Sequence, residues 1–212
     1  MTHLFHLDSS VRAEGSRSRK LSAHYAERWR AANPDGSVTY RDLSADPIPH
    51  LDVAAVSMDW DTERRNADQA AARVLSEQLA GEVLSADTVL IGMPLYNFGP
   101  PSTFKAWLDR MAVRGLTIGA LGDKEFVVVT ARGGGYGPGS PREGWDHREP
   151  WLRHVLEMLG VNDPIFVETE LTLARESPAM AELNLGDAED QSLAVALATI
   201  DGLFDNNDGL AA

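Results

Sequence analysis

Short apolar segments alternate with longer segments of helical periodicity along this chain. The clearest apolar segment, "KEFVVVT" at residues 124–130, is rich in valine. Such a run is typical of a parallel strand that is buried on both faces of a sheet. We expect further strands near residues 2–7, 37–41, 87–93 and 164–169. Parallel strands need a crossover between them, so this alternation limits the chain to a small set of α/β folds.

The helices predicted between these strands follow from apolar spacing. Four apolar residues stand at helical intervals behind Ser102, a candidate N-cap: Phe104, Trp107, Leu108 and Met111. In a long helix over residues 63–86, the predicted inward face consists of Ala67, Ala71, Val74, Leu79 and Val83. Residues 42–61 are predicted to be irregular. Further helices are expected near residues 21–32, 150–159 and 187–204.

These elements favour one domain over residues 1–212. We predict a flavodoxin-like three-layer sandwich, with a five-stranded parallel sheet in the order 2-1-3-4-5 and helices on both faces. In open sheets of this kind, ligands bind outside the carboxyl ends of the strands, where the strand order reverses. The segments that follow the strands are therefore the candidates for a functional site.

Composition excludes several classes of function. The 212 residues include no cysteine, which rules out disulfides, thiolate metal sites and a cysteine nucleophile, and agrees with a cytoplasmic location. A formal net charge of -13 disfavours nucleic acid and anionic membrane surfaces as partners. No apolar run has the length of a membrane span. Neither Asp146-His147 nor the C-terminal "DGLFDNNDG" has the register of a calcium loop or zinc site, so no metal is predicted.

The segment after the first strand, "DSSVRAEGSRSRKL", combines hydroxyls with arginines and leads into a helix. Free N–H groups at a helix N-terminus attract anions, and the hydroxyls and cations add to that attraction. We therefore predict an anion site here. In the alternative, Ser16 or Ser18 only caps the helix and the arginines face solvent.

Two further strand ends point to the same crevice. The third strand runs into Tyr96-Asn97-Phe98, an unusual composition for a simple turn, and the fourth into the glycine-rich "RGGGYGPGSP". Neither the dinucleotide fingerprint nor the Walker loop occurs in the sequence. A ligand with a phosphate at one end and a flat ring system at the other, such as FMN, would use all three segments. Ordinary core packing and a flexible turn are the alternatives.

Three motifs resemble those of the FMN-dependent NADH:quinone oxidoreductases, which are also azoreductases, within the flavodoxin-like quinone reductases. They are the serine-rich first loop, the "PLYNF" strand end and the "ARGG" turn, and the resemblance covers nearly the whole chain. It implies that FMN is bound non-covalently by the following residues: Ser10, Ser16, Arg17, Ser18, Pro94, Leu95, Tyr96, Asn97, Phe98, Ala131, Arg132, Gly133 and Gly134.

The resemblance also implies an activity. Two electrons would pass from NADH or NADPH to quinones, and to aromatic azo compounds, by a ping-pong route, with no catalytic side chain required. Relatives are homodimers whose flavin sites border the interface. The sequence departs from the family at Ala131, where serine is usual, and in the short segment 115–123, which implies a reduced lid over the flavin. The long loop after residue 132 is expected to compensate by bringing Tyr136, Trp145 or His147 toward the flavin ring.

Other functions compete with this interpretation. A flavin reductase that releases reduced FMN would carry the same binding site. A serine esterase would use Ser9 as nucleophile, but no histidine follows His154 to serve as its base. An electron-carrying flavodoxin would need the T-x-T-G-x-T phosphate loop, which is absent.

Overall fold

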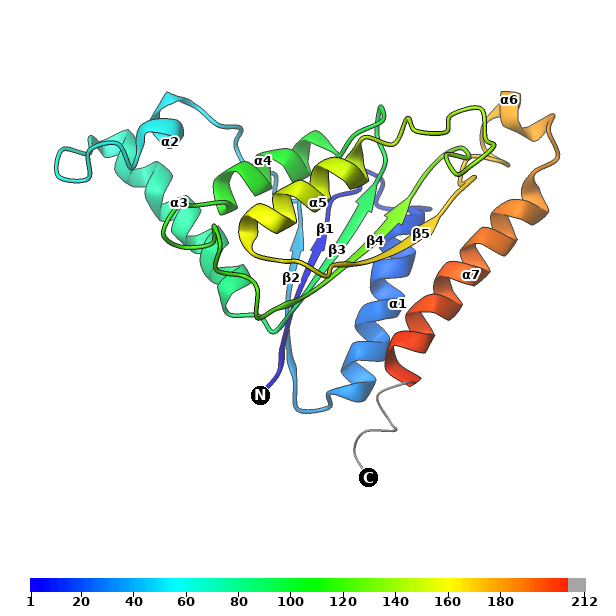
Figure 1. Ribbon diagram of the computed structural model, residues 1–212, viewed down its shortest axis with the longest axis horizontal. Coiled ribbons are helices and arrows are strands. Elements are labelled where there is room, and N and C mark those ends of the chain that lie inside the picture. Colours follow the sequence, from blue (N-terminus) through cyan, green and yellow to red (C-terminus); the bar gives the residue numbers. More distant parts are fainter. Residues whose placement is uncertain (206–212) are drawn as a thin grey trace.

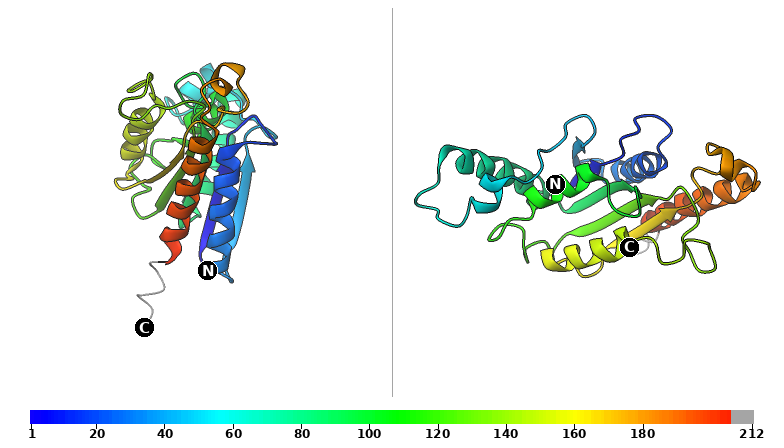
Figure 2. Two further views of the ribbon diagram at one scale, coloured as in Figure 1. Left: turned by 90° about the vertical axis from the view of Figure 1, so that its right-hand side faces the viewer. Right: turned by 90° about the horizontal axis from the view of Figure 1, so that it is seen from above.

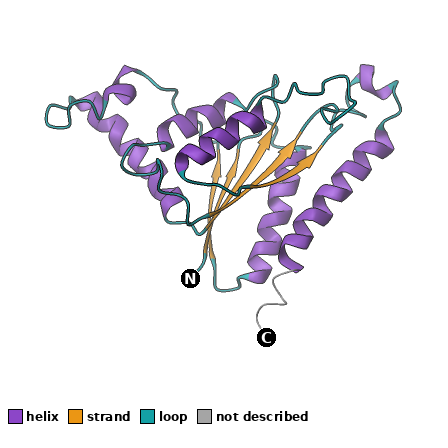
Figure 3. Cartoon of the chain, in the orientation of Figure 1, coloured by secondary structure: helices purple, strands orange, loops and turns teal. Residues whose placement is uncertain are grey.

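Five parallel strands form one sheet in the computed structural model, which describes residues 1–205 (Figure 1). The strand order is β2-β1-β3-β4-β5, as predicted. The strands are β1 (His3–Asp8), β2 (Ser37–Asp42), β3 (Thr88–Pro94), β4 (Glu125–Ala131) and β5 (Ile165–Thr169). Because all of them run in the same direction, their carboxyl ends lie together at one edge of the sheet (Figure 3).

The helices cover both faces of this sheet. They are α1 (Arg17–Ala32), α2 (Val53–Ser57), α3 (Ala67–Leu84), α4 (Ser102–Met111), α5 (Arg148–Leu159), α6 (Pro178–Ala181) and α7 (Gly186–Asp205). Helices α1 and α7 lie side by side on one face, and α5 lies on the other (Figure 2). The predicted three-layer sandwich is therefore confirmed.

Strand residues alternate between the two faces and divide the core in two. Leu90 and Val127 join a cluster with Leu21 and Trp29 of α1, and Ile200 of α7 completes it. The intervening strand residues face the other helices, where the stripe predicted for α4 is buried throughout: Phe104, Trp107, Leu108 and Met111. Burial of each large apolar side chain contributes about 1.5–3 kcal/mol, so this packing dominates the stability of the sandwich.

Three local predictions are wrong. The inward face of α3 is formed by Ala72, Ser76, Leu79, Ala80 and Val83, whereas Ala67, Ala71 and Val74 are exposed. Alanine and serine carry little apolar area, so the phase of this helix is set by its packing against α4 rather than by its sequence. Ser102 is the first helical residue, since Pro101 is the N-cap and makes no side-chain hydrogen bond. The segment predicted to be irregular contains the short helix α2.

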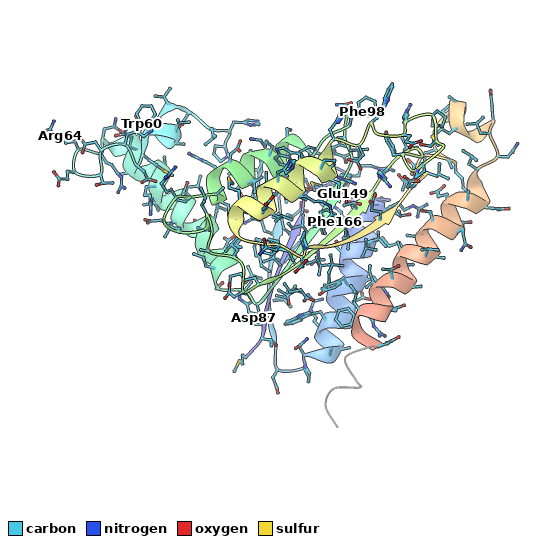
Figure 4. The ribbon with its side chains drawn as sticks, in the orientation of Figure 1. Trp60, Arg64, Asp87, Phe98, Glu149 and Phe166 are labelled. Atoms are coloured by element: carbon cyan, nitrogen blue, oxygen red, sulfur yellow. The ribbon has the colours of Figure 1, made fainter. Side chains whose placement is uncertain are left out.

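The short segment that implied a reduced lid lies away from the crevice. Residues 115–123 lie between α4 and β4, where the N–H of Gly119 donates to the carbonyl of Met158 and that of Leu121 to Leu159. These contacts join it to the C-terminal end of α5, at the amino edge of the sheet. Figure 4 shows the two edges, with Phe98 beyond the carboxyl ends of the strands and Asp87 near their beginnings. This segment does not cover the chain's own crevice.

Candidate functional site

A cavity of about 170 Å³ lies at the carboxyl edge of the sheet. Segments that follow β1, β3, β4 and β5 supply its walls. Its lining residues are Ser10, Arg12, Gly15, Ser16, Arg17, Pro94, Leu95, Tyr96, Ala131, Gly133, Thr172 and Leu173. The structure thus brings together most of the predicted site residues. Those that lie outside the lining are Ser18, Asn97, Phe98, Arg132 and Gly134.

The first loop reaches the cavity through the N-terminus of α1. Ser16 is the N-cap, and its hydroxyl accepts from the N–H of Arg19 at 3.4 Å. The hydroxyl of Ser18, which is fully buried, lies 3.2 Å from that of Ser16. Apart from that of Arg19, the N–H groups of the first helical turn have no partner in a regular helix, so they remain donors for an anion. Capping and anion binding are therefore compatible here, although the sequence presented them as alternatives.

The arginines of this loop do not form a free positive cluster. Arg12 makes a two-pronged pair with Glu176, at 2.8 and 3.1 Å. Arg17 donates to the buried carboxylate of Glu189 at 2.7 Å. Each of these guanidiniums is engaged by a carboxylate from the C-terminal part of the chain. The loop's capacity to bind an anion thus depends chiefly on its hydroxyls and N–H groups.

The aromatic strand end is a tight turn that presents its side chains outward. Tyr96 and Gly99 exchange two backbone hydrogen bonds of 3.0 Å, and Asn97 and Phe98 between them have φ values of 47° and 68°. Left-handed backbone at both central positions is the pattern of a type I′ turn, which costs free energy at a residue such as phenylalanine. The hydroxyl of Tyr96 lies 3.2 Å from that of Ser10, which joins this turn to the first loop.

Phe98 points away from the cavity toward the loop after β4. Its ring contacts Trp145 edge-on at a centroid distance of 5.4 Å and Tyr136 at 6.4 Å. The N–H of His147 donates to the carbonyl of Phe98 at 3.0 Å. All three candidate loop residues therefore lie near the turn. A second cavity, of about 680 Å³, adjoins it and is lined by Tyr96, Asn97, Gly99, Pro100, Ser102, Lys105, His147 and Trp151.

The glycine turn is held against residues that follow β5. The N–H of Leu173 donates to the carbonyl of Gly133 at 3.2 Å, and that of Thr172 to Arg132 at 3.1 Å. A Cβ atom at Gly133 would lie 2.7 Å from Cδ1 of Leu173, so a larger residue here would require the leucine side chain to move. Sequence reasoning missed Thr172 and Leu173. Their position directly after the fifth predicted strand was the available signal.

Comparison with known proteins identifies the family. Residues 2–191 match a family described as having a flavodoxin-like fold. A protein of Frankia casuarinae named "FMN-dependent NADH:quinone oxidoreductase" is 49% identical over 189 residues, which cover 86% of this chain and 90% of that protein. One of the same name from Kineococcus radiotolerans is 44% identical, over 93% of this chain and 97% of that protein. The chain belongs to the FMN-dependent NADH:quinone oxidoreductase family.

Solved structures share its fold at low sequence identity. An azoreductase from Bacillus anthracis strain Sterne superposes with a TM-score of 0.84 at 20% identity, and covers 97% of this chain and 100% of its own. An FMN-dependent NADH-azoreductase from the Ames Ancestor strain, in complex with FMN, has a TM-score of 0.77 at 19% identity, over 96% and 100% of the two chains. The sandwich of this quinone oxidoreductase family member is therefore that of the azoreductases.

Arg132 of this family member turns away from the cavity into a cluster of charges. Its guanidinium lies 2.7 Å from both Glu168 and Glu170 and 3.2 Å from Asp146, which also pairs with the buried Arg148. Burial raises the pKa of Glu168 to about 7, although the positive charges of Arg132 and Arg148 act to lower it. The neighbouring Gly134 faces Arg142 and Tyr136. Arg132 and Gly134 thus anchor the glycine turn from behind.

The remaining candidates have other environments. Ser9 is fully buried and its hydroxyl donates to the carbonyl of Gly92 at 3.1 Å, which is not the setting of an esterase nucleophile. Within residues 1–205, no group of three or more histidine, aspartate or glutamate side chains is arranged to hold a metal ion. The acidic segment 201–209 extends beyond the described residues. In the same part of the chain, no helix is both long and apolar enough to cross a membrane.

Proposed function

We propose that this protein binds FMN non-covalently at the cavity and transfers two electrons from NADH or NADPH to quinones and aromatic azo compounds. Relatives at up to 49% identity carry the name FMN-dependent NADH:quinone oxidoreductase. The observation that carries the proposal is the convergence of the three predicted strand ends on one cavity, which residues after β5 complete. FMN, when bound, supplies the capacity to accept and release two electrons, so the protein's part is to bind, orient and shield it.

The chemistry of the lining fits such a group. The N–H groups of the first turn of α1, with the hydroxyls of Ser10 and Ser16, supply donors for a phosphate. Tyr96 and Leu95 supply a partly apolar wall, and Gly133 leaves backbone accessible beside them. We propose that Arg17, Pro94 and Ala131, which also line the cavity, contact FMN as well, and that Asn97 and Phe98 border the site on the side of the adjoining cavity. Ser18, Arg132 and Gly134 support the wall rather than form it.

A direct test is to incubate the purified protein with FMN, remove unbound flavin, and identify heat-released ligand by chromatography. Riboflavin lacks the phosphate, so its affinity measures the contribution of the remaining contacts. Ser16→Ala is expected to weaken FMN by about tenfold, since a hydrogen bond to a charged group contributes about 1.5–3 kcal/mol, while riboflavin is little affected. Protein that retains no FMN would exclude the proposal.

We further propose a ping-pong route, in which donor and acceptor use the same face of the bound group in turn. Tyr96 lines both this cavity and the larger cavity that adjoins it, which supports a shared approach to the bound group. Steady-state rates at several fixed quinone concentrations should give parallel double-reciprocal lines. Intersecting lines would show a ternary complex instead.

The assembly is a separate proposal. We propose a homodimer with its flavin sites near the interface, in the cytoplasm, with residues 1–212 forming one domain in each copy. Large apolar side chains are exposed close to the site, among them Trp145 and Leu173, which supports a partner surface there. Sedimentation of the purified protein tests this association, and a monomer at assay concentrations would contradict it.

A further inference from the structure

Two carboxylates lie side by side beneath the first loop. Asp8 and Asp42 are the last residues of β1 and β2, and they are register partners on these adjacent parallel strands. Asp8 is 3% exposed and accepts hydrogen bonds from the hydroxyls of Ser22 and Tyr40, at 2.8 and 3.0 Å. These hydroxyls are neutral, so they solvate the charge without cancelling it. Like charges this close to an anion site would repel a phosphate.

Arg19 is the cation that lies between them. Its Nη2 donates to Asp42 at 2.6 Å, and its Nη1 lies 3.6 Å from Asp8, with the side chain only 14% exposed. Burial opposes ionisation of Asp42, but hydrogen bonds from Arg19 and Ser44 outweigh it and lower its pKa to about 2. Asp42 is therefore charged at neutral pH. The Nε2 atom of His6 is 3.5 Å from Asp8 and adds charge only when protonated.

The same guanidinium also holds the backbone of the first loop. Nη2 donates to the carbonyl of Ser10 at 2.8 Å and to the hydroxyl of Ser44 at 3.0 Å. Ser10 lines the cavity, and its hydroxyl lies 3.2 Å from that of Tyr96. Arg19 thus joins the exits of β1 and β2 to the wall of the cavity. Its planar donors suit several acceptors at once, which a lysine would not match.

We propose that Arg19 is a positioning residue for phosphate binding, which neutralises the paired carboxylates of Asp8 and Asp42 and fixes the carbonyl of Ser10. This inference rests on the proposed binding of FMN. It assigns to Arg19 a role distinct from those of Arg12 and Arg17, whose partners Glu176 and Glu189 belong to the C-terminal part of the chain. Arg19 acts through the loop and does not itself line the cavity.

The test compares two flavins on the folded apoprotein by quenching of flavin fluorescence. Arg19→Met keeps the unbranched stem of the side chain as far as the Nε position and removes the guanidinium with its charge and hydrogen bonds, so the Kd for FMN should rise at least about tenfold. The Kd for riboflavin should change by less than about threefold. Arg30→Met, an exposed position in the last turn of the same helix, is the matched control and should change neither value.

A compensating substitution separates charge from shape. In Arg19→Met with Asp42→Asn, the formal charge of the three side chains returns to that of the wild type, so much of the FMN affinity should return. Asp42→Asn alone should tighten FMN relative to riboflavin, and this variant decides the matter if Arg19→Met does not fold. Equal losses of both flavins in Arg19→Met, or weaker FMN binding in Asp42→Asn, would overturn the inference. Wild-type protein that binds neither flavin would instead refute the proposed function.

Discussion

Replacement of Arg17 by alanine removes a guanidinium that joins the first turn of α1 to α7. Its Nη2 donates to Oε1 of Glu189 at 2.7 Å, and the side chains of Arg17 and Glu189 are 31% and 2% exposed. The carboxylate is therefore almost completely removed from water. It keeps one other partner, Arg175, at 3.2 Å. In the variant, the buried carboxylate of Glu189 therefore keeps only its ion pair with Arg175.

The expected cost follows from these distances. At 2.7 Å, the Coulomb attraction between unit charges is about 1.5 kcal/mol with the dielectric constant of water and about 6 kcal/mol with an effective value of 20. Desolvation of the carboxylate offsets much of the larger figure. Net contributions of hydrogen bonds to charged groups are about 1.5–3 kcal/mol. Since Arg175 remains, we expect Arg17→Ala to lower the free energy of unfolding by about 2 kcal/mol.

Urea unfolding of the apoprotein at neutral pH measures this difference. Arg12→Ala is the matched control from the same loop, because Arg12 and Glu176 are each 45% exposed. An exposed pair of this kind contributes about 1 kcal/mol or less. Adding Glu189→Gln to Arg17→Ala should restore part of the loss. If Arg17→Ala costs no more than Arg12→Ala, burial of Glu189 does not strengthen the pair and the reasoning is wrong.

Glu168→Gln should gain stability relative to the wild type as pH rises from 4.5 to about 7, because a raised carboxyl pKa makes the folded state bind more protons than the unfolded state in that interval. Urea midpoints that differ by a constant amount across this range would contradict it. Gly92→Ala should destabilise the protein by about 1–3 kcal/mol, since its Cβ would lie 2.1 Å from Oδ1 of Asp8, whereas Gly81→Ala, with no atom within 4 Å, should be stabilising in thermal melts. Equal melting shifts would refute the steric argument. Trp145→Ala should raise kcat/KM for a multi-ring quinone relative to a small benzoquinone, because its ring lies beside Phe98, and an unchanged ratio would place Trp145 outside the acceptor's path.

Much of the fold could be predicted because its signals are local. The valine run of β4 is buried along its length except at Glu125, and the stripe of Phe104 and Trp107 faces the core as its spacing requires. Alternation of strands and helices then leaves few topologies, and the right-handed crossover selects among them. Where local signals were weak, prediction failed. In α3, small residues occupy both faces, so Val74 was placed inside although it is exposed.

The sequence by itself determined that the serine loop, the aromatic turn and the glycine turn would meet, because parallel strands end at one edge of a sheet. Only the tertiary structure decided how their side chains are used. Arg12 and Arg17 have partners more than 160 positions away, and Arg132 points into a charge cluster behind its turn. The left-handed backbone of Phe98 has no signature in its own residue type. The ion pairs of Arg12 and Arg17 form only when the loop after β5 and α7 have packed, because their partners lie there. The turn at Phe98 is held against the loop after β4, which is also distant along the chain.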